Sequence, residues 1–322
     1  MLAPSAKPKL LVLLGPTAVG KTKLSLEIAQ QFGCEIISGD SMQVYRGMDI
    51  GTAKASAAEQ KLVPHHLIDI HDPSYPFSAA EFQERVKDLI MDIHSRGKLP
   101  FIVGGTGLYI ESVCYNYQFT DVSMDEAFRQ EQEAFALTYG DEALHEKLRQ
   151  IDPGSADRLH ANDRRRVIRA LEIYHISGET MSAHLAAQKK ESPYELCIIG
   201  LTMDRALLYK RIEERIDAMM QEGLIEEVQS LLAAGCPKQA ISMQALGYKE
   251  IVGYLEGEMS LEEAVTLLKR DTRRFAKRQL SWFRHMKDIH WVDVTDSANF
   301  SAHFQIINDI LAGKFVHKIE YN

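Results

Sequence analysis

Short apolar runs and amphipathic stretches alternate along the first hundred residues. Three apolar runs of strand length each end in a glycine-containing loop, at Leu10 to Leu14, Glu35 to Ser38 and Pro100 to Val103. Apolar positions at helical spacing over Lys21 to Gln31 separate the first two runs. Another helix is predicted after Ser78, because Glu81 three residues later completes a capping-box pattern. Strands that alternate with helices predict a parallel sheet with helices on its faces.

The pattern changes after about Tyr117. Residues 118–192 are charge-rich and helical in pattern, with breaks such as Gly140 and Ser177-Gly178. An apolar strand-like run follows at Tyr194 to Met203, and Ile289 to Val294 alternates like a closing strand. We therefore expect residues 1–117 and 193–322 to form one core domain, with basic helices near its C-terminal end. Residues 118–192 are expected to form an inserted all-helical domain.

Asp204 and Ser260 mark two further helix starts in the second part of the core. Asp204 precedes an amphipathic stretch with apolar residues at helical spacing. Ser260, with Glu263 three residues on, opens a helix that continues toward His285.

Composition places the chain among ordinary globular proteins. The 322 residues include 45% hydrophobic and 25% charged side chains, and this length is enough for two domains. No apolar stretch reaches the roughly 18 residues that a membrane helix needs, and the first nine residues do not resemble a signal peptide. We expect a cytoplasmic, monomeric protein with no membrane association. Neither a zinc site nor a disulfide framework is indicated, because no cysteine pair has CxxC spacing among Cys34, Cys114, Cys197 and Cys236.

A complete GxxxxGK[ST] motif lies between the first strand and the first helix. This phosphate-binding loop, or P-loop, consists of Gly15, Pro16, Thr17, Ala18, Val19, Gly20, Lys21 and Thr22. Its backbone amides and the helix N-terminus can hold an anion, Lys21 can reach phosphate oxygens, and Thr22 can ligate magnesium. The motif predicts a P-loop NTPase-like α/β fold and a bound polyphosphate. It does not distinguish a nucleotide from an isoprenoid diphosphate.

Polar residues follow the second and third apolar runs, at the sheet edge where open α/β folds bind ligands. Asp40 follows the second run and could hold magnesium through water, accept a proton from a nucleophile, or simply form a turn. Thr106 lies in Gly104-Gly105-Thr106-Gly107, where an NTPase more often carries a magnesium-binding aspartate. No carboxylate stands there, although Asp69 could substitute for it.

Several motifs together resemble the tRNA dimethylallyltransferases, also called tRNA isopentenyltransferases. The resemblance spans nearly the whole chain. The matching motifs are GPTAVGKT at Gly15 to Thr22, GDSMQVYRGMDIGTAK at Gly39 to Lys54, PHHLID at Pro64 to Asp69, FSAAEF at Phe77 to Phe82, GGTGLYI at Gly104 to Ile110, NDRRRVIRALE at Asn162 to Glu172, RIEERIDAMM at Arg211 to Met220 and ALGYKE at Ala245 to Glu250.

This resemblance implies a donor, a metal and a mechanism. The P-loop would hold the diphosphate of dimethylallyl diphosphate together with Mg²⁺, and Asp40 would be the general base for an adenine amine. Thr106 would contact the reacting groups or the tRNA. Arg215, and with it Arg211, would bind the leaving diphosphate.

The resemblance also implies a tRNA substrate, bound through its anticodon stem-loop. The residues implied to contact it are Asp40, Ser41, Met42, Gln43, Thr106, Arg165, Arg166, Val167, Ile168, Arg169, Gln244, Ala245, Leu246, Gly247, Tyr248 and Lys249. The modified adenosine would be the one next to the anticodon on its 3′ side.

Charge supports RNA binding only locally, since the chain carries a net charge of -8. Arg158 and four arginines between Arg164 and Arg169 cluster in the insertion, and a second cluster runs from Lys269 to Lys287 beside Phe275 and Trp282. Such strips can follow phosphates. They can equally be solvated basic faces whose aromatic residues belong to the core.

Other functions remain open from the sequence. A P-loop kinase, or an adenylate isopentenyltransferase acting on a small molecule, would share the P-loop without needing the arginine-rich insertion. A nucleotide-switched RNA-binding protein would use the loop for a triphosphate and perform no prenyl transfer.

Overall fold

The computed structural model describes residues 7–120, 124–189, 191–296 and 298–316. The chain divides into two compact units. The first comprises residues 1–116 and 192–322, and the second comprises residues 117–191.

One parallel sheet organises the described part of the first unit, with strand order β3-β2-β4-β1-β5-β6. The strands are β1 (Lys9–Leu14), β2 (Cys34–Gly39), β3 (His65–His66), β4 (Leu99–Gly104), β5 (Glu195–Thr202) and β6 (Ile289–Asp293). The expected parallel α/β sheet is confirmed. The sequence did not reveal β3, because two partly exposed residues carry no apolar period.

Strand register brings the binding loops to one edge of the sheet. Leu14 pairs with Gly104, and Gly104 also pairs with Gly39, so β1, β2 and β4 end level with one another. The segments that begin at Gly15, Asp40 and Gly105 therefore leave the sheet side by side. In β1 the side chains from Leu10 to Leu14 have no exposed surface, which anchors this edge in the core.

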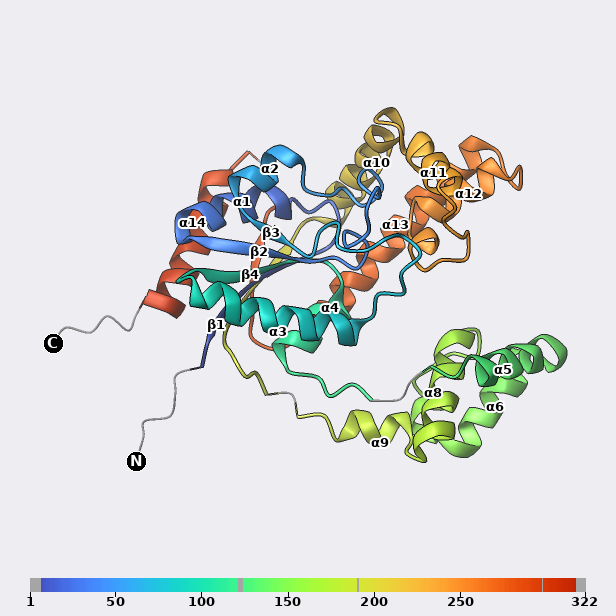
Figure 1. Ribbon diagram of the computed structural model, residues 1–322. Coiled ribbons are helices and arrows are strands. Elements are labelled where there is room, and N and C mark those ends of the chain that lie inside the picture. The colour runs from blue at the N-terminus through green and yellow to red at the C-terminus, as the bar shows by residue number, and fades with distance from the viewer. Residues whose placement is uncertain (1–6, 121–123, 190, 297, 317–322) are drawn as a thin grey trace, which may run out of the picture. The chain divides into compact units, whose positions relative to one another are not determined.

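Helices cover the sheet and extend beyond its binding edge (Figure 1). They are α1 (Lys21–Phe32), α2 (Ala57–Leu62), α3 (Ala79–Ser95), α4 (Gly107–Cys114), α10 (Arg205–Gln221), α11 (Leu224–Ala233), α12 (Tyr248–Leu255), α13 (Leu261–Phe283) and α14 (Phe300–Leu311), with short turns η1 (Ser242–Gln244) and η2 (Ala312–Val316). Side-chain caps at Ser78, Asp204 and Ser260 confirm the predicted starts of α3, α10 and α13. Helices α10, α11, α12 and α13 pack against one another.

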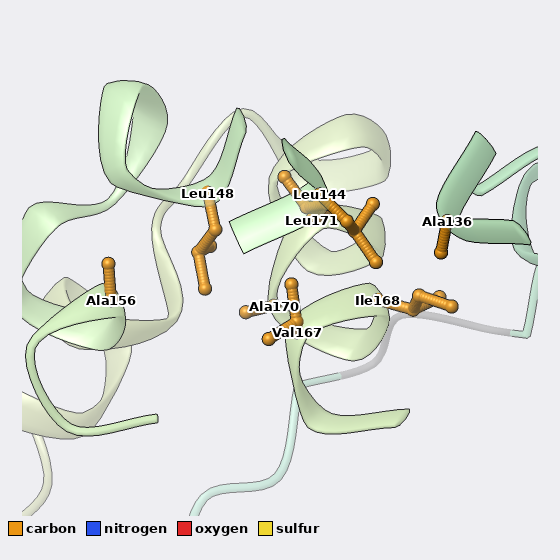
Figure 2. Packing of buried hydrophobic residues seen from close by; sticks show 8 residues of the cluster. All are labelled: Ala136, Leu144, Leu148, Ala156, Val167, Ile168, Ala170 and Leu171. Carbon is orange, nitrogen blue, oxygen red and sulfur yellow. The ribbon is translucent and has the colours of Figure 1, made fainter. Parts of the chain in front are cut away.

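The second unit is entirely helical in its described residues. Its helices are α5 (Glu126–Tyr139), α6 (Asp141–Ile151), α7 (Pro153–Ala156), α8 (Arg164–Ser177) and α9 (Met181–Ala186). Figure 2 shows its core, to which α5, α6, α7 and α8 contribute Ala136, Leu144, Leu148, Ala156, Val167, Ile168, Ala170 and Leu171. This unit thus has a hydrophobic core of its own.

Candidate active site

The P-loop connects β1 to α1. Gly20 precedes α1 with φ 104°, a left-handed conformation that glycine adopts without a Cβ clash. The Lys21 ammonium donates hydrogen bonds to the carbonyl oxygens of Gly15 (3.0 Å) and Pro16 (2.9 Å). Burial and the nearby charge of Arg215 together lower the pKa of Lys21 to about 8, although the charge of Asp40 raises it. Lys21 is therefore a cation held at a site where opposite charge would stabilise it.

Asp40 lies immediately after β2. Its Oδ1 accepts a hydrogen bond from the Met42 amide at 2.8 Å. Burial of the carboxyl group raises the pKa of Asp40, while the Met42 amide and the charge of Lys21 act in the opposite direction. A carboxylate with a raised pKa accepts a proton more readily than an ordinary aspartate, as a general base requires.

Thr106 follows β4 and ties its loop to the loop after β2. The Thr106 Oγ1 accepts a hydrogen bond from the Ser41 amide at 3.1 Å and lies 3.4 Å from the Ser41 hydroxyl, to which it donates. The backbone amide of Thr106 also donates to the Gly39 carbonyl at 3.2 Å. These contacts hold the two loops in one fixed arrangement next to Asp40.

Two cavities meet at Asp40. The first, of about 390 Å³, is lined by P-loop residues and by the two predicted arginines of α10; its lining includes Thr17, Ala18, Gly20, Lys21, Thr22, Asp40, Arg211 and Arg215. We call it the donor cavity. The second, of about 330 Å³, is lined by Asp40, Ser41, Met42, Thr106, Arg215 and every residue from Gln244 to Lys249. We call it the acceptor cavity.

Arg215 lies on the wall of both cavities. Burial lowers the pKa of Arg215, and the charge of Asp40 raises it. An arginine remains charged despite such burial. Its guanidinium therefore places a permanent cation beside the junction, whereas Arg211 lines the donor cavity alone.

Not every predicted residue lies with its side chain in a cavity. Pro16 and Val19 of the P-loop are buried in the protein, as is Tyr248, whose side chain has no exposed surface although the residue borders the acceptor cavity. Gln43 borders the donor cavity, and its side chain accepts a 2.8 Å hydrogen bond from the Ser38 hydroxyl. For these residues, packing within the loops explains the position of the side chain.

Five predicted tRNA-binding residues belong to α8 in the helical unit. Val167 and Ile168 point into that unit's core, so their side chains are not available to a partner. Arg169 pairs with Glu172 at 2.5 Å. Arg165 and Arg166 are exposed, and Arg166 lies 3.2 Å from Asp163. The surface-accessible charge at this site is thus concentrated on Arg165 and Arg166.

The buried carboxylate of Glu172 organises this part of α8. Arg129 of α5 donates two hydrogen bonds of 2.8 Å to its two oxygens. Burial alone would raise the pKa of Glu172, but the hydrogen bonds from Arg129 and Arg169 outweigh it and lower the pKa to about 2. The ion pairs therefore fix α8 relative to α5.

Much of the basic charge on α13 is neutralised within the protein. Lys269 pairs with Asp217 at 2.5 Å, Arg273 pairs with Glu213, and Arg270 pairs with Asp271 at 2.9 Å. Of the aromatic residues, Phe283 is fully buried, while Phe275 lines both cavities. The helix thus serves packing along part of its length and the cavities at Phe275.

Two further residues of the site carried no sequence signal. Glu227 of α11 accepts hydrogen bonds from the amides of Ile50 (2.7 Å) and Gly51 (3.1 Å) and from the Tyr248 hydroxyl (2.6 Å). It thereby holds the backbone at Gly51, which lines the acceptor cavity. Gln279 of α13 lines the donor cavity. Both act on segments more than 170 positions away, which no local pattern indicates.

The oxygen ligands on the wall of the donor cavity suit a metal ion that is also bound by a substrate. Thr22 and Asp40 bring hydroxyl and carboxylate oxygens to the donor cavity, and such oxygens are the ligands that Mg²⁺ prefers. Among the described residues, no three His, Cys, Asp or Glu side chains gather closely enough to form a metal site by themselves. Phosphate oxygens would have to complete the coordination.

Among the residues that the structure describes, no helix has the length and apolar character needed to cross a membrane.

Comparison with known proteins points to one family. The family model described as IPP transferase matches residues 43–286. A tRNA dimethylallyltransferase from Bacillus cereus is 54% identical over 308 residues, covering 96% of this chain and 97% of the relative. Another, from Bacillus anthracis, is 56% identical over 295 residues, covering 92% and 94%.

Solved structures agree with the sequence relatives. A tRNA isopentenylpyrophosphate transferase from Bacillus halodurans is 51% identical, with a TM-score of 0.74 over 97% of this chain and 98% of that one. A eukaryotic dimethylallyltransferase, described as acting on tRNA, is 29% identical with a TM-score of 0.81 over 98% of this chain and 81% of that one.

Proposed function

This chain belongs to the IPP transferase family, and on that premise we propose that it transfers a dimethylallyl group from dimethylallyl diphosphate to tRNA. The acceptor is the exocyclic amine of the adenosine next to the anticodon on its 3′ side, and the products are N6-isopentenyladenosine and diphosphate. The observation that carries the proposal is the position of Asp40 on the wall of both cavities. A base there can meet an acceptor from one side and a donor from the other.

The donor cavity suits an allylic diphosphate. As the bond between the allylic carbon and the diphosphate oxygen breaks, its electron pair stays on the diphosphate, whose negative charge grows. Lys21, Arg211, Arg215 and the amides of the P-loop stabilise that charge in a partly water-excluded site. Their common target is the leaving group rather than the carbon that reacts.

The acceptor cavity suits a base removed from its stack. Enzymes that modify a base extrude it into a pocket, and this cavity is bordered by Ser41, Met42, Thr106 and the segment from Gln244 to Lys249. The adenine amine is a weak nucleophile because its lone pair is conjugated with the ring. As the amine nitrogen forms its bond to the allylic carbon, Asp40 accepts the proton that the nitrogen loses.

Residues of the donor cavity could also hold a magnesium ion. Thr22 would hold the ion, Asp40 on the wall of the same cavity could contribute through water, and the ion would neutralise charge on the diphosphate oxygens. The oxygen-rich donor set and the need for substrate ligands both favour Mg²⁺ over a zinc ion held by protein alone.

The helical unit supplies the remaining tRNA contacts in this proposal. Arg165 and Arg166 are exposed guanidinium groups that can bind phosphates of the anticodon stem. The enzyme acts as a monomer in the cytoplasm, where its tRNA substrate is found.

Ligand protection tests the identity of the donor. Dimethylallyl diphosphate and inorganic diphosphate, each with magnesium, should raise the melting temperature of the purified protein, because a ligand that binds only the folded state stabilises it. ATP at the same concentration should have a much smaller effect. Strong protection by ATP with none by dimethylallyl diphosphate would favour a kinase or a nucleotide switch instead.

A further inference from the structure

We infer that Gln279 of α13 is a positioning residue, which holds the P-loop against the loop after β4 and so sets the shape of the donor cavity. The inference rests on the proposed function for the identity of the ligand, but not for the contacts themselves. Gln279 belongs to none of the motifs that define the P-loop or its neighbours in the sequence.

Gln279 bridges two loops, the P-loop and the loop after β4. Its Oε1 accepts a hydrogen bond from the Thr17 amide at 2.9 Å, and its Nε2 donates to the Gly105 carbonyl at 2.9 Å. The side chain is nearly buried, with 6% of the residue exposed. Both partners are backbone groups of segments that line the donor cavity.

Only a primary amide at this length satisfies both backbone groups. Thr17 requires an acceptor and Gly105 requires a donor, and a neutral amide supplies both at once. A glutamate would set a carboxylate oxygen against the Gly105 carbonyl, and a methionine would leave both groups without a partner. A buried backbone group that loses its hydrogen bond costs more than the bond itself contributes. The chemistry of the bridge therefore specifies glutamine.

Close packing reinforces the bridge at two points of α13. A Cβ atom added at Gly105 would lie 2.3 Å from the Gln279 Nε2, and one added at Gly107 would lie 2.5 Å from the Trp282 ring. Trp282 also donates a 2.8 Å hydrogen bond to Glu111 of α4. Since Gln279 and Trp282 are three residues apart, one face of α13 is pressed along the loop after β4.

The same helix reaches the acceptor cavity. Phe275, one turn before Gln279, lines both cavities, and Arg278 lines the acceptor cavity. Through Gln279 the position of the P-loop depends on how α13 is placed. Loss of the bridge should therefore weaken diphosphate binding specifically, rather than weaken the whole fold.

The test uses Gln279→Met, which keeps the side-chain volume and removes both hydrogen bonds. Gln83→Met is its control, since Gln83 is an equally buried glutamine (5% exposed) whose Nε2 donates to the Ser112 carbonyl and which borders neither cavity. Calorimetric titration with inorganic diphosphate and magnesium should give a Kd about tenfold higher for Gln279→Met, because the variant loses both hydrogen bonds that hold the P-loop against the loop after β4. Gln83→Met should lower the melting temperature and leave that Kd unchanged.

Steady-state kinetics separate positioning from general damage. For Gln279→Met the KM for dimethylallyl diphosphate should rise by a similar factor, while the KM for tRNA stays near the wild-type value. Gly105→Ala perturbs the same contact from the other side, because its methyl group would displace the Gln279 amide, and Gly105 does not have a positive φ that would strain alanine. It serves as the test if Gln279→Met fails to fold.

The double variant completes the test. If both substitutions disrupt the same contact, their effects on diphosphate affinity should not add. The double variant Gly105→Ala with Gln279→Met should then bind diphosphate no more weakly than the single variant with the lower affinity. An unchanged Kd in both single variants, or the same loss in Gln83→Met, would overturn the inference. Diphosphate binding needs no tRNA, so a wild-type protein that binds diphosphate without prenylating tRNA would refute the proposed function and leave the assignment of Gln279 intact.

Discussion

Lys21 and Asp40 line one cavity with opposite charges, and each shifts the pKa of the other. Lys21 lowers the pKa of Asp40, against the larger effect of burial, while Asp40 raises the pKa of Lys21. The two residues come from different loops, at the start of α1 and the end of β2. In the proposed reaction, this arrangement would place the cation for a leaving diphosphate in the same cavity as the base for the incoming amine.

Replacing Asp40 with asparagine should separate binding from chemistry. The amide keeps the shape of the side chain and an acceptor for the Met42 amide, but it cannot take the proton of the amine. We expect tRNA affinity to stay within about twofold and single-turnover transfer to fall by about 10²-fold or more. Filter binding and rapid-quench measurements give the two numbers. Transfer at the wild-type rate would exclude Asp40 as the base.

The pH dependence of transfer should report the same carboxylate. A base must be ionised, so the single-turnover rate should rise with pH through a pKa higher than that of an ordinary aspartate, because burial raises the pKa of Asp40. The residual transfer rate of Asp40→Asn should not show this rise with pH. A wild-type rate that does not change across the acid range would contradict the assignment.

Diphosphate binding should weaken in mildly alkaline solution. Burial lowers the pKa of Lys21 to about 8, so in the free protein the ammonium loses its proton, and its attraction for the anion, as the pH rises through that value. The Kd for inorganic diphosphate should increase between about pH 7 and about pH 9. Lys21→Met should bind more weakly and show no such increase. The same slope in both proteins would assign the titration to another group.

Arg165→Ala and Arg166→Ala should weaken tRNA binding through lost phosphate contacts. Each exposed guanidinium that neutralises a phosphate contributes about 0.7 to 0.9 to the slope of log Kd against log salt concentration, and each variant should reduce the slope by about that amount. Arg149→Ala is the control, as an exposed arginine of the same unit that pairs with Asp157 at 3.2 Å. An undiminished slope in both α8 variants would remove these residues from the tRNA interface.

Glu172→Gln should destabilise the helical unit by about 3 kcal/mol, since it removes the charge that Arg129 and Arg169 neutralise. The pKa of Glu172 is lowered from 4.5 to about 2 in the folded protein, so its contribution is present above the unfolded pKa and is lost as the pH falls through the folded one. Hydrogen exchange of the α5 and α8 amides should show a stability difference from wild type that is constant near neutral pH and shrinks in acid. A constant difference down to about pH 2 would exclude this mechanism.

Local patterns were sufficient to predict most of the sheet, because β1, β2 and β4 are apolar runs that end in glycine-containing loops and because α3, α10 and α13 carry capping residues. The P-loop and Asp40 could also be predicted from the sequence, because both directly follow an apolar strand. Glu227 and Gln279 were not, because each acts on backbone groups of a distant segment through contacts that only the folded chain creates. The residues of α8 expected to contact tRNA were predicted as a continuous run, yet a helix exposes only one face, and Val167 and Ile168 lie on the buried one.

Transfer of label tests the central claim most directly. The protein is incubated with dimethylallyl diphosphate carrying a labelled allylic group, magnesium and an anticodon stem-loop, and the RNA is then digested and analysed by mass spectrometry. We predict one labelled isopentenyl group on N6 of the adenosine that follows the anticodon on its 3′ side. RNA that stays unlabelled under conditions in which the protein binds both substrates would contradict the account.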